Sequence, residues 1–427
     1  MTNKGFVNKS ELKKLFSNFF SLSVLQIVSY ILPLFTLPYL VGVLGSEHFG
    51  ILAFASSTVA FFKITTDYGF NLSATKQVSI YRNDINKLSE IFNSVMFIKL
   101  SLTLICFILL FLLLISFDKF STNRLIYLYT YGTVIGHTLF PVWFFQGLEK
   151  MKFITVLNSL SKLIFTILIF VFVKSKEDFL LVPILNSIGL VFSGVVSIII
   201  IFKKFQIKLY VVTLKKILFY LKDGWYIFIS NLANGFYTNS TIFILGFFTN
   251  NNIVGYYSAG ERLIKIIQNL MSPIFQVLYP FIAKKREESE KSVFKLLKNI
   301  LFFLSCLMLV LGFVLLFKSE FIVIKFFGTE FSRSIVTIQI LAFLPLTYVC
   351  TNILGIQMML NFGLQKDYGK VFIISIIINV LLSIILIPLY KDIGTAITTF
   401  ITELLFVLLM YYYLGKNGYK IFSKNAE

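Results

Sequence analysis

Long apolar stretches separated by short polar connections make up almost the whole chain. A helix that crosses a membrane needs about 20 consecutive, mostly apolar residues. Twelve stretches of about that length follow one another, and we expect transmembrane helices at 16–43, 49–72, 91–117, 125–148, 153–173, 179–202, 224–248, 253–282, 300–317, 335–361, 371–390 and 393–414. The pattern predicts an all-α integral membrane protein with both chain ends on the same side of the membrane.

Composition supports this class and excludes others. The chain is 57% hydrophobic and 14% charged, with a mean hydropathy of +0.85, whereas about a quarter of the residues in a soluble domain are charged. The three cysteines, Cys106, Cys306 and Cys350, lie inside apolar stretches, so we expect neither a disulfide nor a metal cluster. The basic start of the chain leads into a long apolar run without a cleavage site, which indicates an uncleaved first helix.

The net charge of +19 reports topology rather than nucleic-acid binding. Connections on the side of the N-terminus hold 26 Lys and Arg residues, and the opposite connections hold eight. Positive residues are retained on the cytoplasmic side of membrane proteins. Both termini are therefore expected in the cytoplasm, and no nucleic-acid partner is expected.

The stretch 203–223 lies between the sixth and seventh expected helices and carries six lysines. Leu214, Ile217, Leu218 and Leu221 recur at helical spacing within it. This pattern predicts a basic amphipathic helix on the cytoplasmic membrane surface. A solvated loop without lipid contact remains an alternative.

Two short sequence repeats indicate that the chain has two related halves. Gly50-Ile-Leu-Ala-Phe-Ala is matched by Gly255-Tyr-Tyr-Ser-Ala-Gly at an offset of 205, and Phe145–Lys150 is matched by Asn361–Lys366 at an offset of 216. Chance similarity between apolar segments is the alternative explanation. The repeats predict two six-helix lobes related by a pseudo-two-fold axis along the membrane normal, with a cleft between them. The expected divisions are a lobe at 1–205, a cytoplasmic connector at 206–223 and a lobe at 224–427.

Two motifs carry a family resemblance. Pro141-Val-Trp-Phe-Phe-Gln-Gly-Leu-Glu-Lys-Met-Lys-Phe and Asp67-Tyr-Gly-Phe-Asn-Leu-Ser-Ala-Thr-Lys-Gln-Val-Ser resemble the O-antigen flippases (Wzx type) of the multidrug/oligosaccharidyl-lipid/polysaccharide exporter superfamily. The resemblance covers the whole chain. It implies alternating-access transport of undecaprenyl-pyrophosphate-linked oligosaccharide from the cytoplasmic to the periplasmic leaflet of the bacterial inner membrane, in lipopolysaccharide synthesis. The implied partners are this lipid-linked sugar, membrane lipids, H⁺ or Na⁺, and the polysaccharide polymerase and chain-length machinery.

Charged residues inside the apolar stretches are the main candidates for a binding site, because such groups are costly in a bilayer unless they face a cavity or a partner. The second expected helix carries Lys63 and Asp67, and the eighth carries Glu261, Arg262 and Lys265. Stripped of water, a pyrophosphate would need cations of this kind. Structural ion pairs, Lys63 with Asp67 and Glu261 with Lys265, are the alternative. Arg262 has no acid three or four residues away and is the strongest candidate.

Other polar groups are weaker candidates. Residues suited to sugar hydroxyls in the cleft are Gln26, Asn231, Asn234 and Lys162, although hydrogen bonds between helices would explain them equally well. His137 and Glu403 could carry a coupling proton, but a structural role is favoured for His137. Lys99 is expected to extend to the nearby membrane surface.

Enzyme chemistry finds no support in the sequence. It contains no Walker loop, only His48 and His137 as histidines, and no connection long enough for a soluble domain. We therefore expect a transporter without a cofactor, driven by an ion gradient if energy is used. A multidrug exporter of the same superfamily would want unpaired intramembrane acids, and a membrane glycosyl polymerase or ligase would want a large periplasmic loop. Neither is found.

Overall fold

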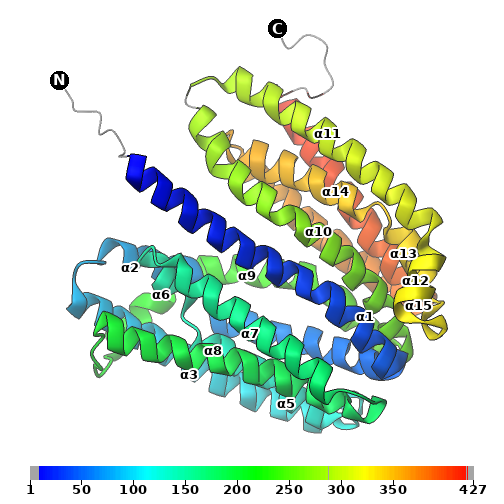
Figure 1. The fold of residues 1–427 in the computed structure, drawn as a ribbon, viewed down its shortest axis with the longest axis horizontal. Helices are drawn as coiled ribbons and strands as arrows, with labels where there is room; N and C mark the ends of the chain where they lie inside the picture. Colours follow the sequence, from blue (N-terminus) through cyan, green and yellow to red (C-terminus); the bar gives the residue numbers. More distant parts are fainter. Residues whose placement is uncertain (1–8, 287, 420, 422–427) are drawn as a thin grey trace.

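The structure is a computed structural model that describes residues 9–286, 288–419 and 421. Side chains are described from Ile31 onward, except at Pro280. The described residues form helices and connecting turns, and they contain no β-strand (Figure 1). The all-α fold predicted from the apolar stretches is therefore confirmed.

The first half of the chain forms nine helical elements. They are α1 (Lys9–Asp67), α2 (Phe70–Ile80), α3 (Ile85–Ser116), α4 (Asp118–Ser121), α5 (Arg124–Leu139), α6 (Val142–Gly147), α7 (Met151–Phe172), η1 (Lys176–Leu180) and α8 (Leu181–Phe205). The second half continues with α9 (Leu214–Phe248), α10 (Asn251–Arg286), α11 (Glu290–Phe317), α12 (Ser319–Phe327), η2 (Thr329–Phe331), α13 (Ser334–Leu341), α14 (Leu344–Thr351), η3 (Asn352–Leu360) and α15 (Gln365–Lys416).

Two of these helices each contain two of the expected transmembrane segments. The backbone of α1 kinks at Gly45, where φ is 71°, and that of α15 kinks at Lys391, where φ is 54°. Glycine lacks the Cβ that disfavours such a left-handed conformation, so the sequence permits a sharp turn at Gly45. Within the described residues, eight helices are long and apolar enough to cross a membrane. This is a multi-pass membrane protein, and the total of twelve crossings remains a prediction.

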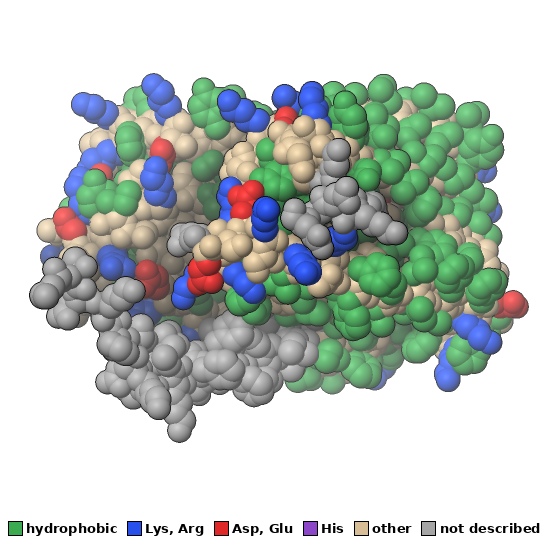
Figure 2. Space-filling model, turned by 90° about the horizontal axis from the view of Figure 1, so that it is seen from above, with side chains coloured by type: hydrophobic (Ala, Val, Ile, Leu, Met, Phe, Trp, Pro, Cys, Tyr) green, Lys and Arg blue, Asp and Glu red, His purple; other side chains and the backbone are tan. Residues whose placement is uncertain are grey.

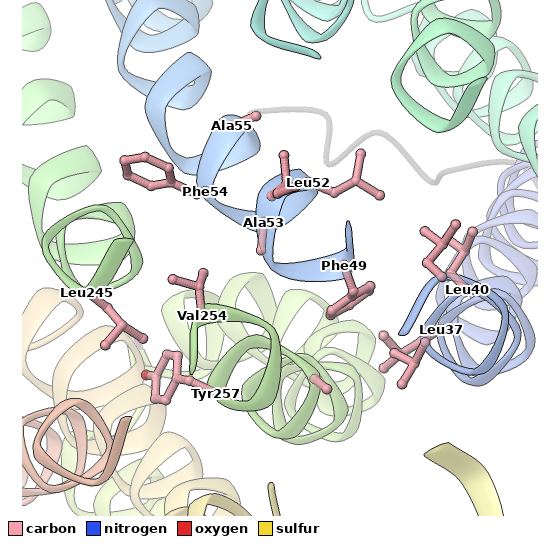
Figure 3. Close-up of a cluster of buried hydrophobic side chains, with 14 of the residues drawn as sticks. Leu37, Leu40, Phe49, Leu52, Ala53, Phe54, Ala55, Leu245, Val254 and Tyr257 are labelled. Atoms are coloured by element: carbon pink, nitrogen blue, oxygen red, sulfur yellow. The ribbon is translucent and has the colours of Figure 1, made fainter. Parts of the chain in front are cut away.

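Three clusters of buried apolar side chains show how the halves are assembled. The largest cluster includes Leu37, Phe54, Leu245, Val254 and Leu341, and so joins both halves of the chain. Figure 3 shows side chains of α1, α9 and α10 meeting in it. The other two clusters are separate, one around Trp143 and Tyr220, the other around Met358. Among the side chains described from Ile31 onward, the lobes share a core at one end only, and in Figure 1 α1 runs between them.

Apolar side chains cover much of the outer surface. On the face shown in Figure 2, charged side chains gather toward one end of the long axis, and hydrophobic ones cover most of the rest. Phe302, Phe303 and Phe317 of α11 are each about 70% exposed. Exposed phenylalanines in such numbers are suited to contact with lipid tails rather than with water.

The connector between the halves differs from the expected surface helix. After α8 ends at Phe205, the chain has no regular structure until α9 begins at Leu214. The helix then continues without a break through Gly224 to Phe248, and Gly224 lies close to the backbone of Tyr68. A connector helix separate from the seventh expected segment is therefore not present. The helix expected from Leu214 is present as the first turns of α9, and the division of the chain at 223/224 remains a prediction.

The chain before α9 and the first turns of α9 are bound to the N-terminal lobe. The Lys216 ammonium lies 2.8 Å from the Glu90 carboxylate, and Asn93 Nδ2 donates a hydrogen bond to the Lys208 carbonyl over 2.8 Å. Tyr220 is buried in the N-terminal core, whereas Leu245 belongs to the shared core. A single helix therefore links one lobe to the interface between the two.

Candidate functional site

A cavity of about 450 Å³ lies where the two halves meet. Its walls come from α1, α5, α7 and α8 of the first half and from α10 of the second. The polar residues among those that line it are Thr36, Ser56, Thr130, Thr133, Lys162, Asn186, Arg262, Lys265 and Asn269. Among the described residues, three cations and no acid line this cavity.

Helix α10 supplies the larger share of the positive charge. Arg262, Lys265 and Asn269 follow one another at helical spacing and so share one face of α10. The Arg262 guanidinium lies 4.9 Å from the centre of the Phe49 ring, a cation–π contact with α1. It makes no ion pair with any side chain that the structure describes. Arg262 thus brings a positive charge to the cavity wall; the neighbouring Glu261 interacts with it electrostatically but does not form an ion pair with it.

Lys265 is the second cation of α10, and its charge is partly balanced. Its ammonium lies 2.8 Å from the carboxylate of Glu261, one turn earlier, as the spacing predicted. The Glu261 side chain is 7% exposed and that of Lys265 is 47% exposed. The acid is therefore held in the protein while the lysine reaches the cavity. Lys162 of α7 lines the same cavity.

Lys63 and Asp67 do not line this cavity, and the ion pair of Asp67 is not the alternative pair with Lys63, although the two still interact electrostatically. The Asp67 carboxylate is bound by Lys99 of α3, with 2.9 Å between Oδ1 and Nζ. Lys99 is 1% exposed, so its expected extension to the membrane surface is wrong. A buried ammonium without a nearby carboxylate is costly, and Lys99 is more deeply buried than Lys63, which accounts for the pairing of Asp67 across helices.

His137 joins the same buried cluster. It lies on α5, and Asp67, Lys63 and Lys99 all interact with it electrostatically. Sequence spacing could not show this, because the acid near His137 comes from another helix. Four titratable groups from α1, α3 and α5 therefore meet inside the N-terminal lobe.

Glu403 forms a further buried link in the C-terminal lobe. The Tyr237 hydroxyl of α9 donates a hydrogen bond of 2.7 Å to Glu403 Oε1 of α15. Lys265 also interacts electrostatically with Glu403. This carboxyl group is thus coupled to the cavity through Lys265, although it does not line the cavity itself.

The expected amide stripes are not brought to the cavity. Asn231 and Asn234 lie on α9 outside the cavity wall. The side chain of Gln26 lies outside the described residues. The amides that do line the cavity are Asn186 and Asn269. The sequence could have indicated Asn269 as a cavity residue, because it continues the face of Arg262 and Lys265 by one more helical turn.

Metal binding has no counterpart in the described part of the chain. No group of three or more His, Cys, Asp or Glu side chains gathers there in a way that could hold a metal ion. The cavity instead presents ammonium, guanidinium, amide and hydroxyl groups. These groups suit an anionic ligand that also carries hydroxyls.

Comparison with known proteins gives a consistent family. Residues 15–286 match the family model described as polysaccharide biosynthesis protein. A protein of Escherichia coli (strain K12) named "Putative O-antigen transporter" is 31% identical over 410 residues, 96% of this chain and 98% of the relative. A relative of the same name from Shigella dysenteriae is 29% identical over 388 residues, 90% of this chain and 95% of its own.

Solved structures share the fold. The inward closed conformation of the lipid II flippase MurJ superposes with a TM-score of 0.76 at 18% identity, over 93% of this chain and 87% of the other. An inward-facing multidrug resistance transporter of the MATE family, in the MOP superfamily, gives a TM-score of 0.67 at 12% identity, over 93% and 94%. At these identities the similarity concerns the arrangement of helices.

Proposed function

The chain belongs to the polysaccharide biosynthesis protein family of membrane transporters, and we propose that it flips undecaprenyl-pyrophosphate-linked oligosaccharide repeat units across the bacterial inner membrane. The unit would pass from the cytoplasmic to the periplasmic leaflet, with both termini of the chain in the cytoplasm. The cargo class is proposed from the family and from the chemistry of the cavity.

The observation that carries this proposal is the cavity between the lobes, with three cations and no acid among its described lining residues. A pyrophosphate that leaves water needs charge-assisted hydrogen bonds, which arginine and lysine supply. Asn186, Asn269 and the lining hydroxyls can bind sugar hydroxyl groups. A cationic drug would meet repulsion in the same place, which disfavours a multidrug exporter.

The arrangement of the lobes supports alternating access. The shared core closes one end of the interface, while at the other end the clusters around Tyr220 and Met358 are separate as far as the described side chains extend. In this conformation the cavity would receive cargo from the side of the connector, which the lysine distribution assigns to the cytoplasm. The polyprenyl tail would stay in the lipid between the helices.

We further propose that Glu403 couples transport to an ion gradient. Its carboxyl group interacts with Lys265 at the cavity and accepts a hydrogen bond from Tyr237. Protonation of Glu403 would remove its negative charge, so the positive charge of Lys265 would be less compensated where it meets the pyrophosphate. Glu261, Asp67 and His137 would then serve to hold the cationic residues in place. Polymerase and chain-length proteins are proposed as partners on the far side.

Arginine 262 provides the direct test. A hydrogen bond to a charged group is worth about 1.5–3 kcal/mol, so Arg262→Ala should reduce cargo binding by roughly tenfold or more. We expect a matching loss of surface polysaccharide in a strain that depends on this gene, measured by gel profile of the polysaccharide. Lys162→Ala and Lys265→Ala should act in the same direction.

Lys152→Ala is the matched control, because Lys152 lies on α7 like Lys162 but is exposed and outside the cavity wall. It should leave the polysaccharide unchanged. Membrane levels of every variant are compared by immunoblot. Normal polysaccharide in Arg262→Ala at normal protein level would contradict the proposed site.

A further inference from the structure

The two lobes touch through positions that the 205-residue offset relates to each other. A Cβ atom on Gly50 would lie 1.8 Å from the Asn251 carbonyl oxygen, and one on Gly255 would lie 2.0 Å from the Ser46 carbonyl oxygen. Ser46 plus 205 is Asn251, and Gly50 plus 205 is Gly255. The contact is therefore reciprocal: α1 and α10 cross so closely at this point that only glycine fits.

Beside this crossing, a carboxylate from the C-terminal half binds the N-terminal half. Glu330 lies in η2, and its Oε1 accepts a hydrogen bond of 2.7 Å from the Ser46 backbone N–H. Ser46 Oγ lies 2.9 Å from the same oxygen and 2.6 Å from Asn252 Oδ1. A carboxylate that accepts backbone N–H groups at the start of a helix is stabilised by the hydrogen bond and by the helix dipole.

The local backbone of α1 is shaped for this contact. The kink at Gly45 makes Ser46 the first residue of a new helical segment, so that its N–H points out of the helix. A Cβ on Gly45 would lie 2.9 Å from Glu330 Oε1. The absent side chain of Gly45 therefore makes room for the carboxylate as well as permitting the left-handed φ.

Two further groups hold Glu330 in place. The Lys176 ammonium, in η1 of the N-terminal half, lies 3.7 Å from Glu330 Oε2. The next residue, Phe331, is 1% exposed and packs edge-on against Phe49 of α1 and Tyr256 of α10. The Ser46 N–H, helped by the Ser46 hydroxyl and Lys176, lowers the pKa of Glu330 below its usual value. The carboxylate therefore stays ionised at neutral pH.

We propose that Glu330 is the latch that holds the two lobes together at the periplasmic end of the cavity. Its partners, Ser46 and Lys176, both belong to the other half of the chain, so the contact breaks whenever the lobes separate at this end. Ser46, Lys176 and Glu330 lie in connections between expected helices that the lysine distribution assigns to the periplasmic side. This inference rests on the proposed function in one respect: the cavity must open to the two sides of the membrane in turn.

The test measures how easily the cavity is reached from outside. Ser56 lines the cavity and serves as the reporter, as Ser56→Cys in a background with Cys106→Ser, Cys306→Ser and Cys350→Ser. Intact cells are treated with a membrane-impermeant maleimide. With the latch intact we expect slow labelling, and with Glu330→Gln or Glu330→Ala we expect labelling that is severalfold faster.

Glu320→Gln is the matched control. Glu320 is an exposed acid on α12, close to Glu330 in the sequence, and it makes no ion pair within the described residues. It should label as slowly as the parent. If neither Glu330 variant accumulates in the membrane, Lys176→Met provides the same test from the other lobe, with a smaller acceleration expected because its contact is longer and exposed. Unchanged labelling in the accumulated variants would overturn the latch.

The labelling and polysaccharide measurements distinguish a failure of the latch from a failure of the proposed cargo site. Faster labelling in Glu330→Gln, together with normal polysaccharide in Arg262→Ala, would support the latch and contradict the proposed cargo site. A second measurement uses Ser46→Cys with Asn252→Cys, joined by a short bifunctional reagent. Joining should abolish export in cells, and reduction of a cleavable linker should restore it. Export that continues at full rate while the pair is joined would also overturn the latch.

Discussion

Asp67 ends the long helix α1, and Lys99 on the neighbouring helix α3 binds its carboxylate. The following residues, Tyr68 and Gly69, have positive φ angles of 45° and 77°, so the chain turns away directly after the acid. The ammonium of Lys99 is almost fully buried, whereas Asp67 retains some exposure. Leaving the buried lysine unpaired therefore costs more free energy than leaving the acid unpaired, so the two members of the pair are not equivalent.

This asymmetry gives a prediction for folding. Asp67→Asn leaves Lys99 buried without its partner and should destabilise the protein by about 3–5 kcal/mol. Lys99→Met should cost less, because Lys63 is one helical turn from Asp67 and can replace the lost cation. Asp67→Asn combined with Lys99→Met should recover most of the loss. Thermal unfolding in detergent, followed by size-exclusion chromatography, measures the order.

Lys63→Met is the control for that series. Alone it should have a small effect, because Asp67 keeps Lys99; combined with Lys99→Met it should be strongly destabilising. If Lys63→Met alone were as damaging as Asp67→Asn, the partner of the acid would be Lys63 rather than Lys99.

At the scale of elements, the crossing of α1 and α10 depends on two glycines. The neighbouring atoms at both positions are backbone carbonyls, which cannot move aside as a side chain can. A methyl group at either position must therefore push the helices apart. Close helix approach through small residues is common in membranes, but here the two helices belong to different lobes.

Gly50→Ala and Gly255→Ala should consequently favour the conformation that is open to the outside. We expect severalfold faster labelling of the Ser56→Cys reporter, without loss of the Glu330 carboxylate. Gly42→Ala is the control, since a Cβ at Gly42 meets no atom within 4 Å, and it should label like the parent. Slow labelling of Gly50→Ala at normal membrane level would mean that the crossing tolerates a methyl group and does not set the closure.

At the scale of the whole molecule, the apolar pattern predicted the helices well but not their neighbours. Segment lengths and lysine positions are local properties, and they are sufficient for a multi-pass helical fold. Arg262, Lys265 and Lys162 could be singled out because isolated charges in apolar segments rarely lack a function. The partner of Asp67, 32 residues away on another helix, and that of Ser46, 284 residues away, depend on packing between helices. No sequence periodicity encodes such contacts.

Orientation is the whole-molecule property that most needs a direct measurement. In the cysteine-free background, Lys208→Cys in the connector should react with an impermeant maleimide only after the cells are permeabilised. Lys325→Cys on α12 should react in intact cells. Both side chains are exposed, so access to reagent differs only by side of the membrane. The reverse pattern would invert the topology and place the Glu330 contact in the cytoplasm.

The uninterrupted course of α9 has a mechanical consequence. Tyr220 is anchored in one lobe and Leu245 in the shared core, and these anchors lie ~38 Å apart along the helix at 1.5 Å per residue. A helix held at both ends resists a tilt of either lobe. A tilt of ~10° over that length would displace the end of the helix by ~6–7 Å.

The middle of α9 carries side chains that bond to its own backbone. There the Ser230, Thr238 and Asn239 side chains hydrogen-bond to backbone carbonyls one turn earlier, at Tyr226, Asn234 and Gly235. Such side-chain bonds, like a central glycine, soften a helix toward bending. If the lobes rotate as alternating access requires, we expect bending of α9 to concentrate between Ser230 and Asn239, and the helix to oppose that rotation elastically.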